Sequence, residues 1–216
     1  MIAALHTSGL AFDEATHTYR VDGREIPSVT QVLADNRLRP DFSRVPPDVL
    51  DRARQRGTAV HLATHYHDEG SLDPTTVDAV VVPYLDAWLQ FLHERRVRIL
   101  ELEKRYAHST LGYAGMIDRI ALVDVGGRER RCVLDIKTGD PSGAEYQTAA
   151  YAELYRDAGH VSSLPPERWS VQLHPDRPIP YTVTPYRELR DWRIFRAALD
   201  LTHARAAQGQ SWREAA

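Results

Sequence analysis

Two segments decide the fold that we expect for this chain: GYAGMIDR at residues 112–119 and VLDIKTG at residues 133–139. Each lies in a stretch with the composition of a β-strand, over residues 113–125 and 131–137, and each contains one aspartate. A polar turn that contains Gly126 and Gly127 separates the two stretches, so we expect them to pair as neighbouring antiparallel strands. That pairing would bring Asp118 and Asp135 together on one face of a sheet.

The segment around Asp135 has the chemistry of a site for a divalent metal ion. Asp135 and Lys137 are two residues apart, so their side chains point the same way in an extended strand. The carbonyl of Ile136 lies between them and could add a further oxygen ligand. Magnesium prefers such hard oxygen ligands and keeps several of its waters, so a few carboxylates suffice. The metal would acidify a bound water and offset charge on a phosphate, while Lys137 would orient or deprotonate that water or stabilise the transition state.

The surrounding pattern predicts a mixed α/β fold, with a central mixed β-sheet flanked by helices. Alternating residues predict a strand over 99–106, which extends the two strands above into a meander, and two further strands over 169–173 and 181–184. A strand pair is expected over 10–26, followed by a short helix that a capping box between Ser28 and Gln31 opens. Helices are expected over 48–67, from near Pro74, over 144–159, and from Pro185 to about residue 207. Pro83 should kink the second of these or mark a second start.

The length of 216 residues predicts one domain over residues 1–216. Within it we expect an N-terminal hairpin, short helix and loop over 10–47, a core over 48–184, and a C-terminal helix and tail over 185–216. No apolar run is long enough to cross a membrane, and the N-terminus lacks a signal pattern, so we expect a cytoplasmic protein without a membrane partner.

Composition leaves a role in nucleic-acid binding open. The net charge of −3 does not itself indicate such a role, but a metal site built of carboxylates adds negative charge that bound cations offset. Basic residues cluster at Arg52, Arg54 and Arg56, at Arg95, Arg96, Arg98, Lys104 and Arg105, and at Arg128, Arg130 and Arg131. Each cluster taken alone fits a solvated surface. Cys132 is the only cysteine, which excludes an internal disulfide and predicts a buried residue in its apolar strand.

The arrangement Asp118…Asp135-Ile136-Lys137 resembles the motif of the PD-(D/E)XK nuclease superfamily. The approach to the first carboxylate from Gly112 is similar to that of the RecB-like exonuclease branch, although Ile117 stands where the literal motif has proline. Two helical motifs of that branch also have counterparts, in GTAVH at residues 57–61 and QTAAY at residues 147–151. Order and spacing agree over residues 57–155, and the segment around residues 19–30 is similar to stand-alone exonucleases of phages and prophages.

The resemblance implies a restriction-endonuclease-like core and a role for each matching residue. His61, Asp118, Asp135 and the Ile136 carbonyl would bind one or two Mg²⁺ or Mn²⁺ ions, and Lys137 would be catalytic. Relatives often have an acidic residue at the place of Glu103, which would hold a metal-bound water. Gln147 and Tyr151 lie one helical turn apart and would position the DNA or the active-site loop. The cysteines that hold a cluster in several relatives are absent, so no iron–sulfur cluster is expected.

The implied function is a metal-dependent deoxyribonuclease, most simply an exonuclease in phage or prophage recombination, replication or repair. Its substrate would be linear duplex or single-stranded DNA, in a bacterial cell or an infected host, with a recombination or single-strand-binding protein as a further partner. Two alternatives stay open: a structure-selective endonuclease, and a catalytically silent module that binds DNA or a partner.

Each site residue also has a structural interpretation. Asp118, Asp135 and Lys137 could form a surface ion-pair ladder, His61 could be a hydrogen-bonded core histidine, Gln147 a surface residue and Tyr151 a core aromatic. His61 and His65 have the spacing of a helical zinc pair, but Leu62 stands in place of the glutamate of a zinc protease. We therefore expect His65 and His67 to face solvent.

Overall fold

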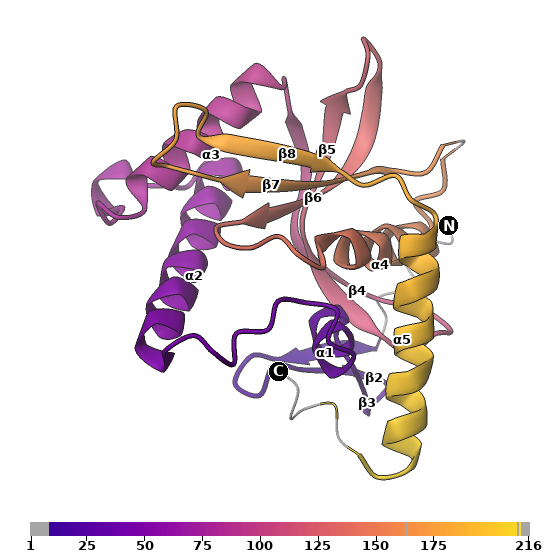
Figure 1. The fold of residues 1–216 in the computed structure, drawn as a ribbon. Coiled ribbons are helices and arrows are strands. Elements are labelled where there is room, and N and C mark those ends of the chain that lie inside the picture. Colours follow the sequence, from indigo (N-terminus) through magenta and orange to yellow (C-terminus); the bar gives the residue numbers. More distant parts are fainter. Residues whose placement is uncertain (1–8, 163, 211, 213–216) are drawn as a thin grey trace.

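The computed structural model describes residues 9–162, 164–210 and 212, and its centre is a five-stranded mixed sheet (Figure 1). The strands follow one another across the sheet as β4 (Arg98–Ala107), β5 (Ala114–Asp124), β6 (Glu129–Lys137), β7 (Glu167–Leu173) and β8 (Tyr181–Pro185). Only the β6–β7 pair is parallel among these neighbours. The expected meander of three antiparallel strands and the mixed α/β fold class are therefore confirmed.

Helices cover both faces of this sheet, so its inner strands are apolar on both sides (Figure 1). One layer consists of α2 (Pro47–Glu69) and α3 (Val82–Glu94), and the other of α1 (Val29–Asp35), α4 (Ala144–Asp157) and α5 (Arg190–Ala207). Strand β6 alternates between the layers, because Leu134 packs with the α3 core and Val133 with the α4 core. The same alternation directs Asp135 and Lys137 to the α4 side.

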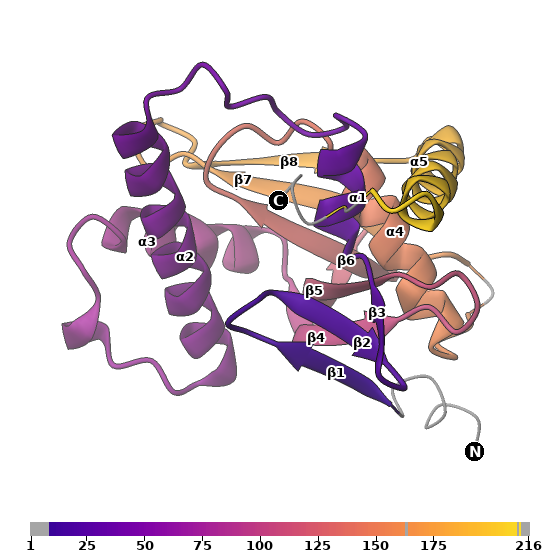
Figure 2. The same cartoon turned by 90° about the horizontal axis from the view of Figure 1, so that it is seen from below.

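The expected strand pair over residues 10–26 is a separate three-stranded antiparallel sheet. Its strands are β1 (Leu10–Asp13), β2 (Thr18–Val21) and β3 (Arg24–Ile26). The sheet is fixed to the start of β5, where the Ala114 N–H donates to the Pro27 carbonyl at 3.0 Å. Tyr19 and Ile26 pack there against Ala107 and Ala114. Figure 2 shows the small sheet beside the β4 and β5 end of the large one.

Two expected helix starts are wrong, and proline chemistry explains both. Near Pro74 there is only a short 3₁₀ turn, Pro74–Thr76, and α3 begins at Val82 with Pro83 in its first turn. A proline fits there because the first helical N–H groups need no partner within the helix. Pro185 does not open the last helix; it ends the edge strand β8, opposite Trp169, and α5 begins at Arg190.

Other local expectations are confirmed. The capping box between Ser28 and Gln31 begins α1, and Cys132 is fully buried in β6. Most of the tail after Gln210 lies outside the described residues. No helix in the described part of the chain is long and apolar enough to cross a membrane.

Candidate active site

The β5–β6 ladder ends where the two aspartates lie. Its last pair is Arg119 with Leu134, and the same register continued by one residue would set Asp118 opposite Asp135. The ladder does not continue there. Instead, the Asp118 carboxylate accepts a hydrogen bond from the Ile136 N–H at 2.9 Å. Both carboxylates therefore flank the point where the paired strands separate, which confirms the expected proximity of the two strands.

Asp135 is buried and incompletely satisfied. Its side chain is 1% exposed, and its Oδ1 and Oδ2 lie 3.1 and 2.9 Å from the Lys137 ammonium. Lys137 donates a well-directed hydrogen bond only to Oδ1, and Oδ2 is buried without a hydrogen bond from any described residue. Burial raises the pKa of Asp135 to about 6; the Lys137 charge opposes this rise and the Asp118 charge adds to it. The site thus contains a buried carboxylate oxygen with spare capacity for a cation.

Lys137 contacts Asp135 and Gln147, and this row of side chains continues along α4 to Tyr151. The Lys137 ammonium contacts Asp135 and donates to Gln147 Oε1 at 2.9 Å, and Gln147 Nε2 donates to the Tyr151 hydroxyl at 3.1 Å. Burial lowers the pKa of Lys137, but the charges of Asp135 and Asp118 outweigh it, so the pKa is raised overall. Lys137 is therefore a protonated, oriented donor in this structure.

A glycine allows α4 to come close enough for this row to form. A Cβ at Gly115 of β5 would lie 2.7 Å from Tyr151 Cε1, 3.1 Å from Val29 Cγ2 and 3.3 Å from Leu154 Cδ1. Such distances are shorter than ordinary van der Waals contact, so no side chain fits there without a shift. Tyr151 is 4% exposed and has its hydroxyl directed at Gln147, so it is a core aromatic with a polar contact to the site.

Glu103, on β4, lies beside Asp118 of the neighbouring strand β5. The neighbouring pairs Leu102–Arg119 and Lys104–Ile117 place it opposite Asp118 in register. Its φ of 42° is in the left-handed region, which costs a non-glycine residue about 1–3 kcal/mol. Strain of this kind within a strand is typical of functional positions.

Two histidines of α2 face this acidic row. His61 Nδ1 lies 3.8 Å from Asp118 Oδ2, and His65 Nδ1 lies 3.6 Å from Glu103 Oε2. The His61 side chain is 32% exposed, which differs from a buried core histidine. The expectation that His65 faces solvent is wrong: its side chain is 21% exposed, and its Nδ1 is buried without a hydrogen bond from the described residues. His67 is 37% exposed and contacts Asp68.

A buried ionic cluster fixes α2 against β5, and the sequence did not indicate it. Arg119, which is 0% exposed, donates to Asp68 at 2.7 Å, to the Asp118 carbonyl at 2.8 Å and to Thr64 at 3.3 Å. The Trp88 indole donates to the other Asp68 oxygen at 3.0 Å. We call these four side chains, Thr64, Asp68, Trp88 and Arg119, the Arg119 cluster. Because it joins α2 to the residue after Asp118, it sets the position of the histidines above the carboxylates.

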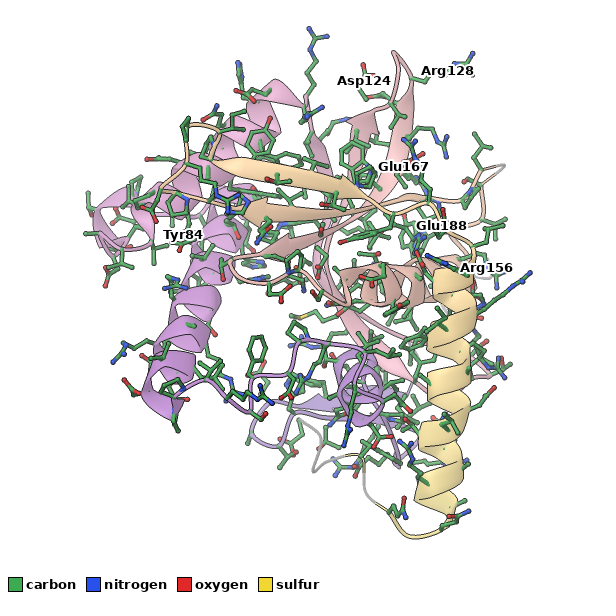
Figure 3. All side chains as sticks on the ribbon, in the orientation of Figure 1. Tyr84, Asp124, Arg128, Arg156, Glu167 and Glu188 are labelled. Atoms are coloured by element: carbon green, nitrogen blue, oxygen red, sulfur yellow. The ribbon has the colours of Figure 1, made fainter. Side chains whose placement is uncertain are left out.

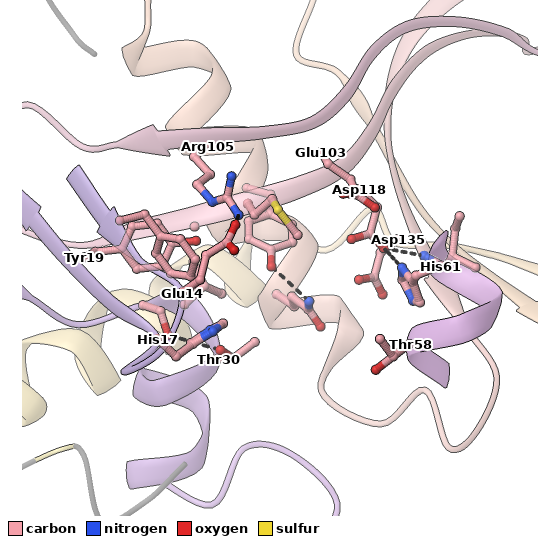
Figure 4. A pocket seen from close by; sticks show the side chains of 18 of the residues that line it. Glu14, His17, Tyr19, Thr30, Thr58, His61, Glu103, Arg105, Asp118 and Asp135 are labelled. Carbon is pink, nitrogen blue, oxygen red and sulfur yellow. Dashed lines mark hydrogen bonds and ion pairs between the residues drawn. The ribbon is translucent and has the colours of Figure 1, made fainter. Parts of the chain in front are cut away.

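One cavity of about 570 Å³ is lined by the two aspartates, Lys137, Glu103 and His61, whereas His65 and the Arg119 cluster lie outside its lining (Figure 4). At one end lie Glu103, Asp118, Asp135 and His61, and at the other lie His17, Tyr19 and Arg105. Phe12 also lines the cavity and contacts the rings of His17 and Tyr19 and the Arg105 guanidinium. Sequence reasoning missed that second end. The only local signal was the spacing of Glu103 and Arg105, two residues apart on one strand. The cluster Arg128, Arg130 and Arg131 belongs to the far turn of β5 and β6, which Asp124 and Arg128 mark in Figure 3.

The oxygen atoms near Asp118 are of the kind that bind a hard divalent cation, but their side chains are not arranged as a metal-binding shell. No group of three His, Cys, Asp or Glu side chains in the described ranges is arranged to hold a metal ion. The Lys137 ammonium lies against Asp135 and the Ile136 N–H against Asp118. The N–H and C=O of one strand residue point to the same neighbour, so the Ile136 carbonyl is also directed towards Asp118. With the Asp135 oxygen that contacts Lys137 but accepts no hydrogen bond from the described residues, this set has the chemistry that magnesium prefers.

Comparison with known proteins gives only remote similarity. No protein-family model and no curated protein matches the chain. Among solved structures, it is similar to the crystal structure of SSO0001, with 16% identity and a TM-score of 0.38, over 82% of this chain and 75% of that one. It is also similar to LHK-Exo in complex with dAMP, with 12% identity and a TM-score of 0.38, over 85% of this chain and 89% of that one. At these values the similarity identifies neither a family nor an activity.

Proposed function

We propose that this protein is a Mg²⁺- or Mn²⁺-dependent deoxyribonuclease that acts as an exonuclease in phage or prophage recombination, replication or repair. The observation that carries the proposal is the meeting of Asp118, Asp135 and Lys137 where the β5–β6 ladder ends. The sequence around these residues resembles the PD-(D/E)XK motif. The catalytic core would comprise residues 48–184 of a single domain, with residues 10–47 and 185–216 as its additions.

The electrostatics of the cluster support chemistry over a purely structural role. A buried carboxylate whose pKa is raised to about 6 is costly to keep, and Asp135 still has an oxygen without a hydrogen bond from the described residues. Asp118 is also largely buried, and its charge raises the pKa of Asp135 further. Groups perturbed by burial and by a like charge inside a cavity are characteristic of active sites. A divalent cation would relieve both effects at once.

Each residue has a distinct role in this proposal. Asp118, Asp135, the Ile136 carbonyl and His61 would hold the ion, which when bound would acidify a water and offset phosphate charge. Glu103 would accept a hydrogen bond from a water at the neighbouring position. Lys137 would act as an ammonium, because its raised pKa opposes loss of the proton; it would stabilise negative charge on the reacting phosphate. Gln147 and Tyr151 would fix the Lys137 amine.

The test is digestion of end-labelled linear DNA and closed circular DNA, with Mg²⁺, with Mn²⁺ and with neither. Loss of linear DNA alone, dependent on the metal, is the expected result, and the label gives the direction of digestion. The matched variants are Lys137→Ala and Lys104→Ala, since Lys104 is the other lysine of the chain and is exposed on β4. Lys137→Ala should abolish digestion, and Lys104→Ala should retain it.

Two outcomes would support the alternatives. Nicking of the circle would indicate a structure-selective endonuclease. Intact DNA under every metal condition, with the protein folded and bound to DNA, would indicate a silent binding module and end the proposal. Full activity of Lys137→Ala would remove Lys137 from its catalytic role.

A further inference from the structure

The end of the cavity opposite the carboxylates is an aromatic wall, which we define as Phe12, His17 and Tyr19. Phe12 and Tyr19 are cross-strand partners on β1 and β2, with ring centroids 4.5 Å apart, and the His17 ring meets Phe12 edge-on at 5.1 Å. Tyr19 is buried and belongs to the core of the small sheet, but Phe12 is only partly buried and His17 is exposed. Both residues line the cavity, so a ligand there can reach the exposed His17 ring and the part of the Phe12 ring that Arg105 and Tyr19 leave uncovered.

A guanidinium lies against this wall. Arg105 of β4 is 4.4 Å from the Phe12 ring centroid, and its Nε is buried without a hydrogen bond from the described residues. Its salt bridge to Glu14 is 3.7 Å long, and the Glu14 side chain is 85% exposed. An ion pair of this kind contributes little and exchanges readily for another acceptor. Arg105 can thus offer donors to an anion beside an aromatic surface.

The wall is held in a fixed position relative to the carboxylates. The Ala114 N–H bonds to the Pro27 carbonyl, and Tyr19 packs against Ala107 at the end of the strand that carries Glu103 and Arg105. His17 has a φ of 50°, a left-handed conformation that turns the chain between β1 and β2. The contacts to β4 and β5 make the small sheet a rigid second wall of the cavity.

We infer that the aromatic wall and Arg105 form a nucleobase subsite that selects an unpaired DNA strand; the inference rests on the proposed function. A planar base would stack on the Phe12 ring and meet the perpendicular His17 ring at its edge, and Arg105 would contact the adjoining phosphate. Such stacking tolerates any sequence, because every base has a π-face. A cavity of about 570 Å³ has the size of a small-ligand site, which suits one unpaired base with its neighbouring phosphate.

The test is a double-mutant cycle between the protein and the DNA, measured by equilibrium binding in EDTA so that no hydrolysis is needed. The probe is a fluorescent ten-residue oligothymidine, compared with versions in which one base at a time is replaced by an abasic unit. Phe12→Leu keeps apolar packing but removes the ring face, and should weaken binding of the intact probe about tenfold or more. Phe12→Trp should restore it. One abasic position should weaken binding to the wild type by a similar factor and leave binding to Phe12→Leu unchanged.

The matched control is Tyr84→Leu. Tyr84 belongs to α3 and has Arg56 5.7 Å from its ring centroid, but it does not line the cavity (Figure 3). This variant should bind the probe as the wild type does. Equal binding by Phe12→Leu and wild type, or abasic effects that are the same in both, would overturn the subsite.

The same variants separate this inference from the proposed function. Metal-dependent digestion of DNA with an unchanged preference for single strands in Phe12→Leu would remove the subsite and keep the nuclease. Binding that depends on Phe12, in a protein that digests no DNA with any metal, would keep the subsite and remove the nuclease.

Discussion

Two buried ionic clusters lie back to back in this protein, on consecutive residues of β5. Asp118 joins Asp135 and Lys137 at the end of the ladder, and we call these three the ladder-end cluster. Arg119, the next residue, joins the Arg119 cluster. The Arg119 and Asp68 side chains are fully buried, whereas in the ladder-end cluster the two aspartates are buried and the Lys137 side chain is 23% exposed. The two clusters also differ in how far their hydrogen-bonding groups are satisfied.

In the Arg119 cluster both oxygens of Asp68 accept hydrogen bonds, and Arg119 has three acceptors. In the ladder-end cluster Asp135 keeps a buried oxygen without a hydrogen bond from the described residues, and its pKa is raised to about 6. A cluster that only stabilises the fold needs a partner for each of its charged groups, because an unpaired buried charge is strongly destabilising. Incomplete pairing beside a cavity leaves capacity for a ligand. The four predictions below test this distinction.

The largest effect is expected at Asp135. Asp135→Asn should lower metal-dependent DNA hydrolysis at least about a thousandfold, because it removes a charged ligand from the reacting centre. Thermal unfolding in EDTA should show that the fold is retained. An active Asp135→Asn, or one that does not fold, would contradict the functional assignment of the ladder-end cluster.

The Arg119 cluster should respond in the opposite way. Arg119→Met should lower the free energy of unfolding by about 3–5 kcal/mol, since it leaves Asp68 buried and without its cationic partner. Urea denaturation measures this. Arg130→Met is the control: Arg130 is 25% exposed and lies 3.3 Å from Glu167, so its loss should cost about 1 kcal/mol or less. Equal stabilities of the two variants would show that burial does not distinguish the clusters.

The pH dependence of stability should reveal the incomplete pairing of Asp135. Its pKa of about 6 lies above the ordinary value of 3.8, so the folded state holds the proton more tightly than the unfolded state. The contribution of Asp135 to the free energy of unfolding is therefore complete below about pH 4, where its carboxyl is protonated, and is lost as the pH rises through 6. The two pKa values differ by about 2, equivalent to at most about 3 kcal/mol.

The measurement is urea denaturation in EDTA from pH 4 to pH 7, with Asp135→Asn as the comparison. The free energy of unfolding of Asp135→Asn should not fall with rising pH through this group, and the variant should be more stable than the wild type at pH 7. Parallel curves for the two proteins would mean that Asp135 is ionised throughout and adequately paired.

The smallest effect is expected at Tyr151. Tyr151→Phe removes one hydrogen bond to Gln147, worth about 1 kcal/mol, and so should lower kcat a few-fold with little change in KM. Tyr155→Phe is a matched control one helical turn further, where the hydroxyl contacts Arg131 outside the cavity. Steady-state kinetics on single-stranded DNA compare the two. Equal kcat values would show that Tyr151 does not act through Gln147 and Lys137.

Local patterns were sufficient for most of the fold. The strands over 99–106, 113–125 and 131–137 alternate or are apolar over the length of a strand, and the helix over 144–159 has clear ends, so pattern and structure agree. The helix start at Pro185 failed because a proline fits both a helix start and the end of an edge strand, whereas Pro74 begins only a short 3₁₀ turn. Tertiary pairing of β8 with β7 decided the case of Pro185.

Contacts between distant residues explain what the sequence did not predict about the site. Arg119 looks like one polar residue in an apolar strand, and its partner Asp68 lies 51 residues away. The same holds for Phe12, whose ring meets Arg105 only because the small sheet packs on β4. His65 was misplaced because the residue it faces, Glu103, lies on a strand that is distant in sequence.

Gly115 has a practical consequence for anyone who wishes to redesign this protein. Three elements, α1, α4 and β5, meet at its missing side chain, since a Cβ there would touch Val29, Tyr151 and Leu154. A residue of graded size at this position would act as an adjustable spacer that moves α4, and Lys137's partner Gln147 with it, without altering any charged group. Gly115→Ala would thus give a variant in which α4 is moved away from the sheet without a new polar or charged group.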